Sequence, residues 1–152
     1  MSALIKYKKR HLLASQARAR YYKTMIHDHL IHILGSKKCL TTDLEAYKTD
    51  KSYEPGQIPS LVVCAETDDD VKQVLDYANS HKVPVTTRGA GSGKSGGAIP
   101  EDGSIVISLE KMNRIIEIDT ANNCITVEPG VITDTIKDIA EQHQLFYPPD
   151  PS

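Results

Sequence analysis

The sequence lacks tryptophan, has one phenylalanine and contains only three cysteines. Cys39, Cys64 and Cys124 are far apart and odd in number, so they form neither a disulfide framework nor a Cys-x-x-Cys metal pair. No apolar run approaches the roughly 20 residues that a membrane-spanning helix needs. The 18 basic and 20 acidic residues nearly cancel, which excludes nucleic-acid binding by bulk charge. With 39% hydrophobic residues in 152, the chain is expected to be one soluble globular unit with reduced thiols in the cytoplasm.

Positive charge is concentrated at the start of the chain. Residues 1–30 contain seven lysines and arginines, against Asp28 as their one acidic residue. The favoured interpretation is the solvated face of a first helix; import into an organelle and attachment to an anionic membrane surface are the alternatives. A secretory signal is not expected, because no apolar segment follows the basic cluster. His27, His29 and His32 are spaced by 2 and 3 residues rather than 4, so they predict surface positions and no metal site.

The rest of the chain alternates between strand and helix patterns. A continuous apolar run at 61–65 predicts a buried strand, and the spacing of apolar residues predicts a helix over 68–81. With a strand at 83–87, this order predicts a βαβ unit with a parallel pair of strands. Further expected elements are a strand at 105–109, a hairpin of 115–119 with 124–128, and a helix capped by Thr133 or Asp134 that runs to about Gln144.

Five of the nine glycines lie within residues 89–97, hereafter the glycine loop, directly after the strand at 83–87 and Arg88. Glycine allows positive φ angles and a close approach of the backbone to a ligand. Successive N–H groups at the carboxyl end of a parallel strand can therefore converge on an anion. A flexible Gly/Ser linker is the alternative, but such linkers do not usually follow a buried strand and a basic residue.

Two common phosphate motifs do not fit the glycine loop. Gly93-Lys94-Ser95 resembles the end of a Walker A loop, but Arg88 stands where that motif needs its first glycine. Gly91, Gly93 and Gly96 satisfy Gly-x-Gly-x-x-Gly in spacing alone. Both motifs require a following helix, which Gly97 and Pro100 disfavour.

A longer stretch of sequence around the glycine loop agrees better with a different type of phosphate-binding loop. Residues 83–100 resemble the pyrophosphate loop of FAD-linked oxidases of the vanillyl-alcohol oxidase or p-cresol methylhydroxylase (PCMH) type, in the branch of the glycolate oxidase and D-lactate dehydrogenase flavoprotein subunits. Separate matches support it: residues 47–50, 109–113, 118–119, 128–131 and 147–152. The resemblance implies an α+β fold, the N-terminal part of a PCMH-type FAD-binding domain, with a small parallel βαβ subdomain and the start of an antiparallel one. It implies a basic extension at 1–21 and the domain at 22–152.

The resemblance also implies FAD as the cofactor, with its pyrophosphate on backbone N–H groups of the glycine loop. The role of Arg88 stays open between a phosphate contact and a structural contact. Positions that match the family's cofactor-binding segments are Arg88, Gly89, Ala90, Gly91, Ser92, Gly93, Ser95, Gly96, Gly97, Pro129, Gly130, Val131, Pro149, Asp150, Pro151 and Ser152.

The family's substrate-binding and catalytic regions follow the segment that this sequence resembles. No catalytic residue is therefore expected within 1–152, and a 2-hydroxy acid is the expected substrate of the complete enzyme only. A companion chain that supplies the rest is one hypothesis. Two other functions compete: a stand-alone nucleotide- or anion-binding module, and a non-catalytic remnant. Peripheral attachment of the complete enzyme to a membrane is a further expectation.

Overall fold

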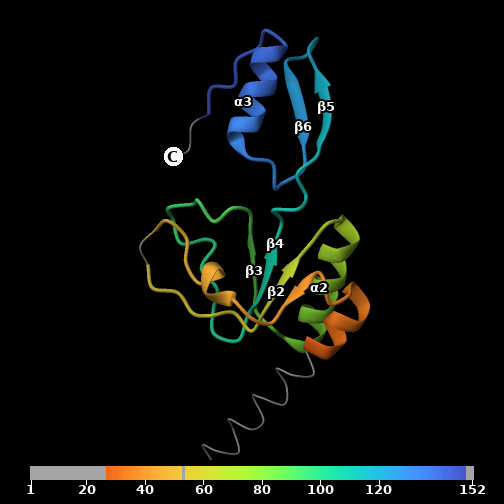
Figure 1. Cartoon of the computed structure of the whole chain (residues 1–152), viewed down its shortest axis with the longest axis vertical. Coiled ribbons are helices and arrows are strands. Elements are labelled where there is room, and N and C mark those ends of the chain that lie inside the picture. Colours follow the sequence, from red (N-terminus) through yellow and green to blue (C-terminus); the bar gives the residue numbers. More distant parts are fainter. Residues whose placement is uncertain (1–26, 53, 150–152) are drawn as a thin grey trace, which may run out of the picture.

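The protein was analysed as a computed structural model, which describes residues 27–52 and 54–149. The basic extension predicted at 1–21 lies outside the described residues. Residues 27–34 are helical. The elements after them are β1 (Cys39–Leu40), the 3-10 helix η1 (Leu44–Tyr47), β2 (Leu61–Cys64), α2 (Asp68–His81), β3 (Val85–Arg88), β4 (Ile105–Ser108), β5 (Ile115–Asp119), β6 (Cys124–Val127) and α3 (Thr133–Gln142). Figure 1 shows β5, β6 and α3 as one body beside the four-stranded sheet that β1 to β4 form.

The four-stranded sheet has the order β1-β2-β4-β3. β2 and β3 are both parallel to β4, and β1 pairs antiparallel with β2. The predicted βαβ unit is therefore present, but the prediction that its two strands form a pair is wrong, because β4 lies between them. All four residues of β4, Ile-Val-Ile-Ser, are buried, whereas β3 is Val-Thr-Thr-Arg and partly exposed. The strand that is apolar on both faces takes the central position, and the polar strand takes the edge.

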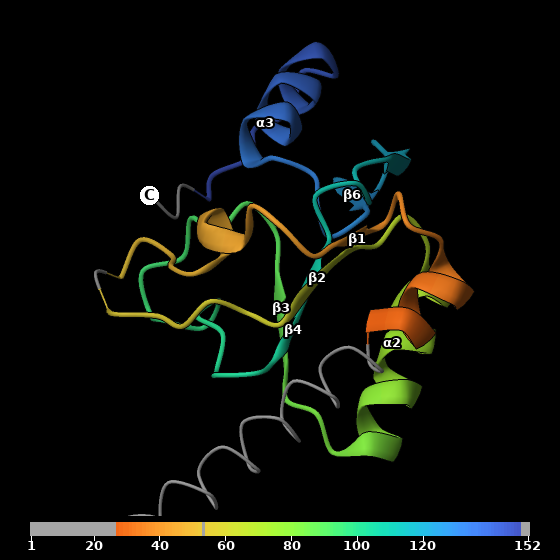
Figure 2. The same cartoon turned by 60° about the horizontal axis from the view of Figure 1, so that its bottom comes forward.

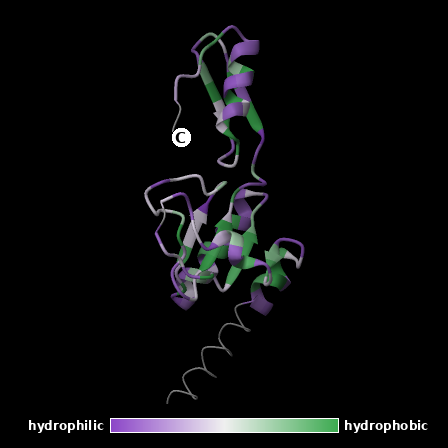
Figure 3. Ribbon diagram, turned by 60° about the vertical axis from the view of Figure 1, so that its left-hand side comes forward, coloured by the Kyte–Doolittle hydropathy of each residue, from purple (hydrophilic) through white to green (hydrophobic). Residues whose placement is uncertain are grey.

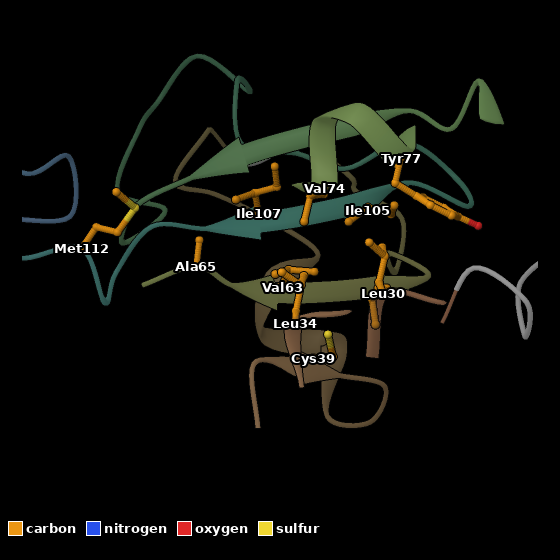
Figure 4. Close-up of a cluster of buried hydrophobic side chains, with 11 residues drawn as sticks. Leu30, Leu34, Cys39, Val63, Ala65, Val74, Tyr77, Ile105, Ile107 and Met112 are labelled. Atoms are coloured by element: carbon orange, nitrogen blue, oxygen red, sulfur yellow. The ribbon is translucent and has the colours of Figure 1, made fainter. Parts of the chain in front are cut away.

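Apolar side chains cover both faces of this sheet. On one face the cluster joins the first helix, α2 and the strands, and Figure 4 shows Val74 of α2 beside Ile105 and Ile107 of β4, with Leu30 near Val63. On the other face, Leu44 of η1 packs with buried residues of β2 and β4. Figure 3 shows hydrophobic residues in the strands and hydrophilic residues in the connections between them. Burial on both faces makes this sheet the rigid base for the loops at its ends.

α2 begins with a capping box. The Thr67 hydroxyl accepts from the Asp70 N–H, and the Asp70 carboxylate accepts from the Thr67 N–H. Asp70 also accepts from the Glu66 N–H at 2.9 Å and from Lys38 Nζ at 2.7 and 2.9 Å. Burial acts to raise the pKa of Asp70, but the hydrogen bonds from Lys38 and the backbone outweigh it and hold the pKa below its usual value. This buried carboxylate joins the turn before β1 to the start of α2.

We expect Asp70→Asn to lower the free energy of unfolding by about 2 kcal/mol at neutral pH, the scale of one charge-assisted hydrogen bond. Because the folded pKa of Asp70 lies below the unfolded value of about 3.9, its contribution is present above that value and is lost as the pH falls through the folded pKa. Urea unfolding between pH 7 and 2.5 measures this. The exposed Asp68→Asn is the control, and equal acid sensitivity of wild type and Asp70→Asn would contradict the assignment.

The second body is the predicted hairpin and the helix after it. β5 and β6 pair antiparallel, with an irregularity between Ile115 and Glu117. The prediction that Thr133 or Asp134 caps α3 is wrong: Ile132 holds the N-cap position in an extended conformation, with no side-chain hydrogen bond to the helix. α3 therefore begins at Thr133, one residue earlier than it would begin if the Thr133 side chain were its cap. α3 ends at Gln142, since Gln144 has a φ of 59° and leaves the helical conformation.

The histidines of the first helix occupy its surface side. His29 and His32 are exposed, and His27 is half-buried. The His29 ring stacks on Tyr77 at 4.8 Å between centroids, and His81 stacks on Tyr77 at 4.1 Å. These rings therefore take part in the packing of the first helix on α2. Within residues 27–52 and 54–149, no helix has the length and apolar character needed to cross a membrane.

Candidate functional site

The three parallel strands β2, β4 and β3 end in register, and their carboxyl ends together form one edge of the sheet, hereafter the carboxyl edge. Cys64 of β2 and Arg88 of β3 both pair with Ser108 of β4. The connections that leave this edge are residues 65–67, the long segment 89–104 that begins with the glycine loop, and residues 109–114. Open α/β sheets bind ligands beyond the carboxyl ends of their strands. The glycine loop therefore lies where a ligand site is expected.

The conformation of the glycine loop excludes both common phosphate motifs. No helix follows it, since residues 89–104 contain only turns and bends before β4. Gly91 and Gly96 have φ angles of 69° and 79°, which residues with a side chain adopt only with strain. The glycine loop therefore offers an anion the backbone N–H groups of a loop, hereafter the cradle, and no helix N-terminus.

The N–H groups in the first part of this cradle, residues 89–95, are unused within the described structure. Among the described residues, no acceptor takes a hydrogen bond from the backbone N–H groups of residues 89–95. Most of these residues are exposed, and a Cβ built on Gly93 or Gly97 would meet no atom within 4 Å. Lys94 is exposed and adds a positive charge. Free donors, open space and a nearby cation fit a diphosphate group.

Arg88 lies beneath the cradle and is 8% exposed. Its Nη1 donates to the Thr49 carbonyl at 3.1 Å, and its guanidinium lies 5.3 Å from the centroid of the Tyr47 ring. A Cβ on Gly91 would stand 1.8 Å from Arg88 Nη2. The guanidinium therefore fills the space under Gly91, and this geometry favours the structural role that the sequence left open.

Residues 49–52 form a second wall of the loop. Lys51 N–H donates to the Gly93 carbonyl at 3.0 Å. The Asp50 carboxylate accepts from Ser52 N–H at 2.8 Å and from Ala98 N–H at 3.4 Å. Hydrogen bonds from Ser52, and then from the N–H groups of Ala98 and Gly96, hold the pKa of Asp50 below its usual value. Residues 47–50 match the family in sequence, but the sequence indicates no role for them. The reason is that the contacts of Asp50 with Ala98 and of Lys51 with Gly93 span more than 40 positions.

Residues 128–131 bring the second body to the same edge. A Cβ on Gly89 would be 3.9 Å from the Pro129 carbonyl oxygen, and Gly130 N–H donates to the Met112 carbonyl at 2.8 Å. Glu128 is buried; its carboxylate accepts from Arg114 N–H and Nε, each at 2.8 Å, and these bonds lower the pKa of Glu128. The structure thus brings Pro129 next to Gly89 of the glycine loop.

Of the C-terminal candidates, the structure describes Pro149 alone. Pro149 is exposed, and Asp150, Pro151 and Ser152 lie outside the described residues. Pro148 and Tyr147 line a hollow of about 230 Å³ with Lys137 and Glu141 of α3, rather than with the glycine loop. In both views the last described residues lie on the side of the molecule where the connection 89–104 lies (Figures 1 and 2).

A larger hollow, of about 440 Å³, lies between the start of α2 and the hairpin. Asp68, Asp69 and Glu128 line it, and Arg114, its one basic lining residue, is already bonded to Glu128. With Glu128 and Arg114 offsetting each other, the carboxylates of Asp68 and Asp69 oppose the binding of a phosphate group. Charge therefore favours the glycine loop over this hollow as the anion site.

Comparison with known proteins identifies the family. The sequence model described as "FAD binding domain" matches residues 59–152. The glycolate oxidase subunit GlcD of Bacillus subtilis is 38% identical over 106 residues, which cover 70% of this chain and 23% of that protein. The D-lactate dehydrogenase of Anaerostipes hadrus is 39% identical over 93 residues, covering 61% of this chain and 20% of the relative. The chain thus spans about a quarter or less of these curated relatives.

Solved structures agree with this result. Substrate-bound p-cresol methylhydroxylase superposes with a TM-score of 0.67 at 29% identity, over 80% of this chain and 25% of that one. An alkyldihydroxyacetonephosphate synthase superposes with a TM-score of 0.64 over 76% of this chain and 27% of the other, but at 16% identity it supports the fold alone. The predicted α+β fold, the PCMH-type family and FAD as its cofactor are thereby confirmed. This chain belongs to the FAD binding domain family of FAD-linked oxidoreductases.

Proposed function

We propose that the glycine loop holds the pyrophosphate of FAD. The observation that supports this is the row of unused N–H groups at residues 89–95, at the carboxyl edge of the sheet. Pro129 and Gly130 approach the same edge, and we propose that they and the adjoining Val131 would contact another part of the cofactor. The proposed cofactor-binding residues remain Arg88, Gly89, Ala90, Gly91, Ser92, Gly93, Ser95, Gly96, Gly97, Pro129, Gly130, Val131, Pro149, Asp150, Pro151 and Ser152.

Each part of the chain has a distinct task in this proposal. The N–H groups of the first half of the loop donate to phosphate oxygens, and Lys94 offsets part of their charge. Arg88 supports the loop from below, since its guanidinium donates to the Thr49 carbonyl. Bound FAD supplies the acceptor of the substrate's hydride. We assign no catalytic residue within the described residues.

The substrate proposal rests on the names of the relatives. They include glycolate oxidase, D-lactate dehydrogenase and the D-2-hydroxyglutarate dehydrogenase of Stutzerimonas stutzeri, 31% identical over 125 residues. We propose that residues 22–152 serve as the N-terminal part of the FAD-binding domain of an enzyme that oxidises a 2-hydroxy acid. Polypeptide beyond these residues, in the same chain or in a companion chain, would carry the base that removes the substrate proton.

Titration of the 152-residue chain with FAD tests the proposal. We expect quenching of flavin fluorescence that saturates, and a shifted visible flavin band that stays with the protein after desalting. ADP, which has the same pyrophosphate and adenosine, is the comparison ligand. A folded chain that retains neither ligand would overturn the proposal, and retention of ADP without FAD would favour a nucleotide-binding module instead.

A further inference from the structure

We propose that Asp50 is a positioning residue that sets where on the glycine loop the cofactor's pyrophosphate binds. The inference concerns a residue outside the set assigned above, and its ligand-binding part rests on the proposed function. It stands on the contacts between residues 49–52 and the two ends of the loop.

The first step is the division of the loop into two halves. The N–H groups of residues 89–95 have no acceptor among the described residues. In the second half, residues 96 and 97, the Gly96 N–H faces the Asp50 carboxylate, and the N–H of Ala98, directly after the loop, donates to Asp50 Oδ2 at 3.4 Å. Asp50 thereby occupies donors that an anion could otherwise use. Its negative charge also repels a phosphate from this half, which leaves residues 89–95 as the phosphate-binding half.

The second step is the anchoring of the loop. Lys51, next to Asp50, donates its N–H to the Gly93 carbonyl at 3.0 Å, and Asp50 Oδ1 accepts from Ser52 N–H at 2.8 Å. Because one short segment holds both Gly93 and Ala98, the distance between these two residues is fixed. This restraint keeps the free N–H groups in their binding arrangement before the ligand arrives, which lowers the entropy lost on binding.

Three variants separate these effects. Asp50→Ala removes the charge and both acceptors, and Asp50→Asn keeps one oxygen acceptor without the charge. Asp102→Ala is the matched control, since Asp102 lies exposed in the same β3–β4 connection and makes no side-chain hydrogen bond or ion pair with the described residues. Asp50→Ala removes a charge that repels phosphate, but it also releases the loop at Ala98, and we expect the released loop to dominate the affinity. We therefore expect Asp50→Ala to raise the Kd for FAD by about tenfold or more, Asp50→Asn by an intermediate factor, and Asp102→Ala to have no effect.

Amide hydrogen exchange, followed by NMR without ligand, supplies a readout that is independent of FAD. The Lys51 and Ile99 N–H groups donate to the Gly93 and Gly96 carbonyls, which the substitution leaves in place. Faster exchange of these two amides in Asp50→Ala, with unchanged exchange in β2 and β4, would report movement of the loop itself. Loss of protection at Ser52 and Ala98 alone would report only the missing acceptor.

The proposal is overturned if Lys51 and Ile99 exchange at wild-type rates in Asp50→Ala, or if their exchange rises while the Kd for FAD stays unchanged. A wild-type chain that binds no FAD would overturn the proposed function instead. In that case the exchange of Lys51 and Ile99 still decides whether Asp50 positions the loop.

Discussion

Gly91→Ala is expected to weaken FAD binding by about 30-fold, equivalent to about 2 kcal/mol. Gly91 has a φ of 69°, and a side chain in this region costs about 1–2 kcal/mol. The new Cβ would also stand 1.8 Å from Arg88 Nη2. Arg88 is held by the Thr49 carbonyl and the Tyr47 ring, so its displacement would loosen the base of the loop. Flavin fluorescence titration of the variant measures the change in Kd.

Gly103→Ala separates backbone strain from the effect on the site. Gly103 has a φ of 73°, and a Cβ there would meet no atom within 4 Å. It lies in the turn before β4, outside the proposed binding residues. Both variants should therefore lose thermal stability through backbone strain, Gly91→Ala the more because of its contact with Arg88, while Gly91→Ala alone should lose affinity for FAD. Equal FAD affinity in the two variants would show that neither Gly91 nor the base of the loop contributes to FAD binding.

The sequence predicted the elements whose signals are local. Thr67 and the three aspartates that follow mark the start of α2, and the capping box forms there. The absence of a helix after the glycine loop could also be predicted, because Gly97 and Pro100 oppose one regardless of the tertiary fold. These features depend on propensities within a few residues.

Features that depend on distant contacts were not predictable. The insertion of β4 between β2 and β3 depends on which strand is apolar on both faces, a comparison across 48 positions from Leu61 to Ser108. The role of Arg88 could not be decided, since its partners Tyr47 and Thr49 come from an earlier segment. Asp50 was missed for the same reason: its carboxylate meets Ala98 only in the folded chain. The sequence could thus indicate the backbone proposed to face the ligand, but not the side chains that support it.

The second prediction concerns Gly130, where two backbone segments cross. We expect Gly130→Ala to lower the free energy of unfolding by about 3 kcal/mol, near the upper end for overpacking. The added Cβ would lie 2.0 Å from the Leu109 carbonyl oxygen and 2.9 Å from that of Met112. These are backbone atoms of the segment that follows β4, so no side-chain rotation relieves the clash. A decrease in Tm of about 10 °C is expected in thermal unfolding.

Gly97→Ala is the control for this substitution, because a Cβ there meets no atom within 4 Å and its φ is not in the left-handed region. Its unfolding free energy should stay within about 0.5 kcal/mol of the wild type. The alanine at 130 has a further consequence, since Gly130 N–H donates to the Met112 carbonyl and Pro129 adjoins Gly89. Forcing the two backbone segments apart there would separate residues 129–131 from the glycine loop. A Gly130→Ala chain with wild-type Tm and FAD affinity would therefore show that this crossing neither joins the two bodies nor shapes the cofactor site.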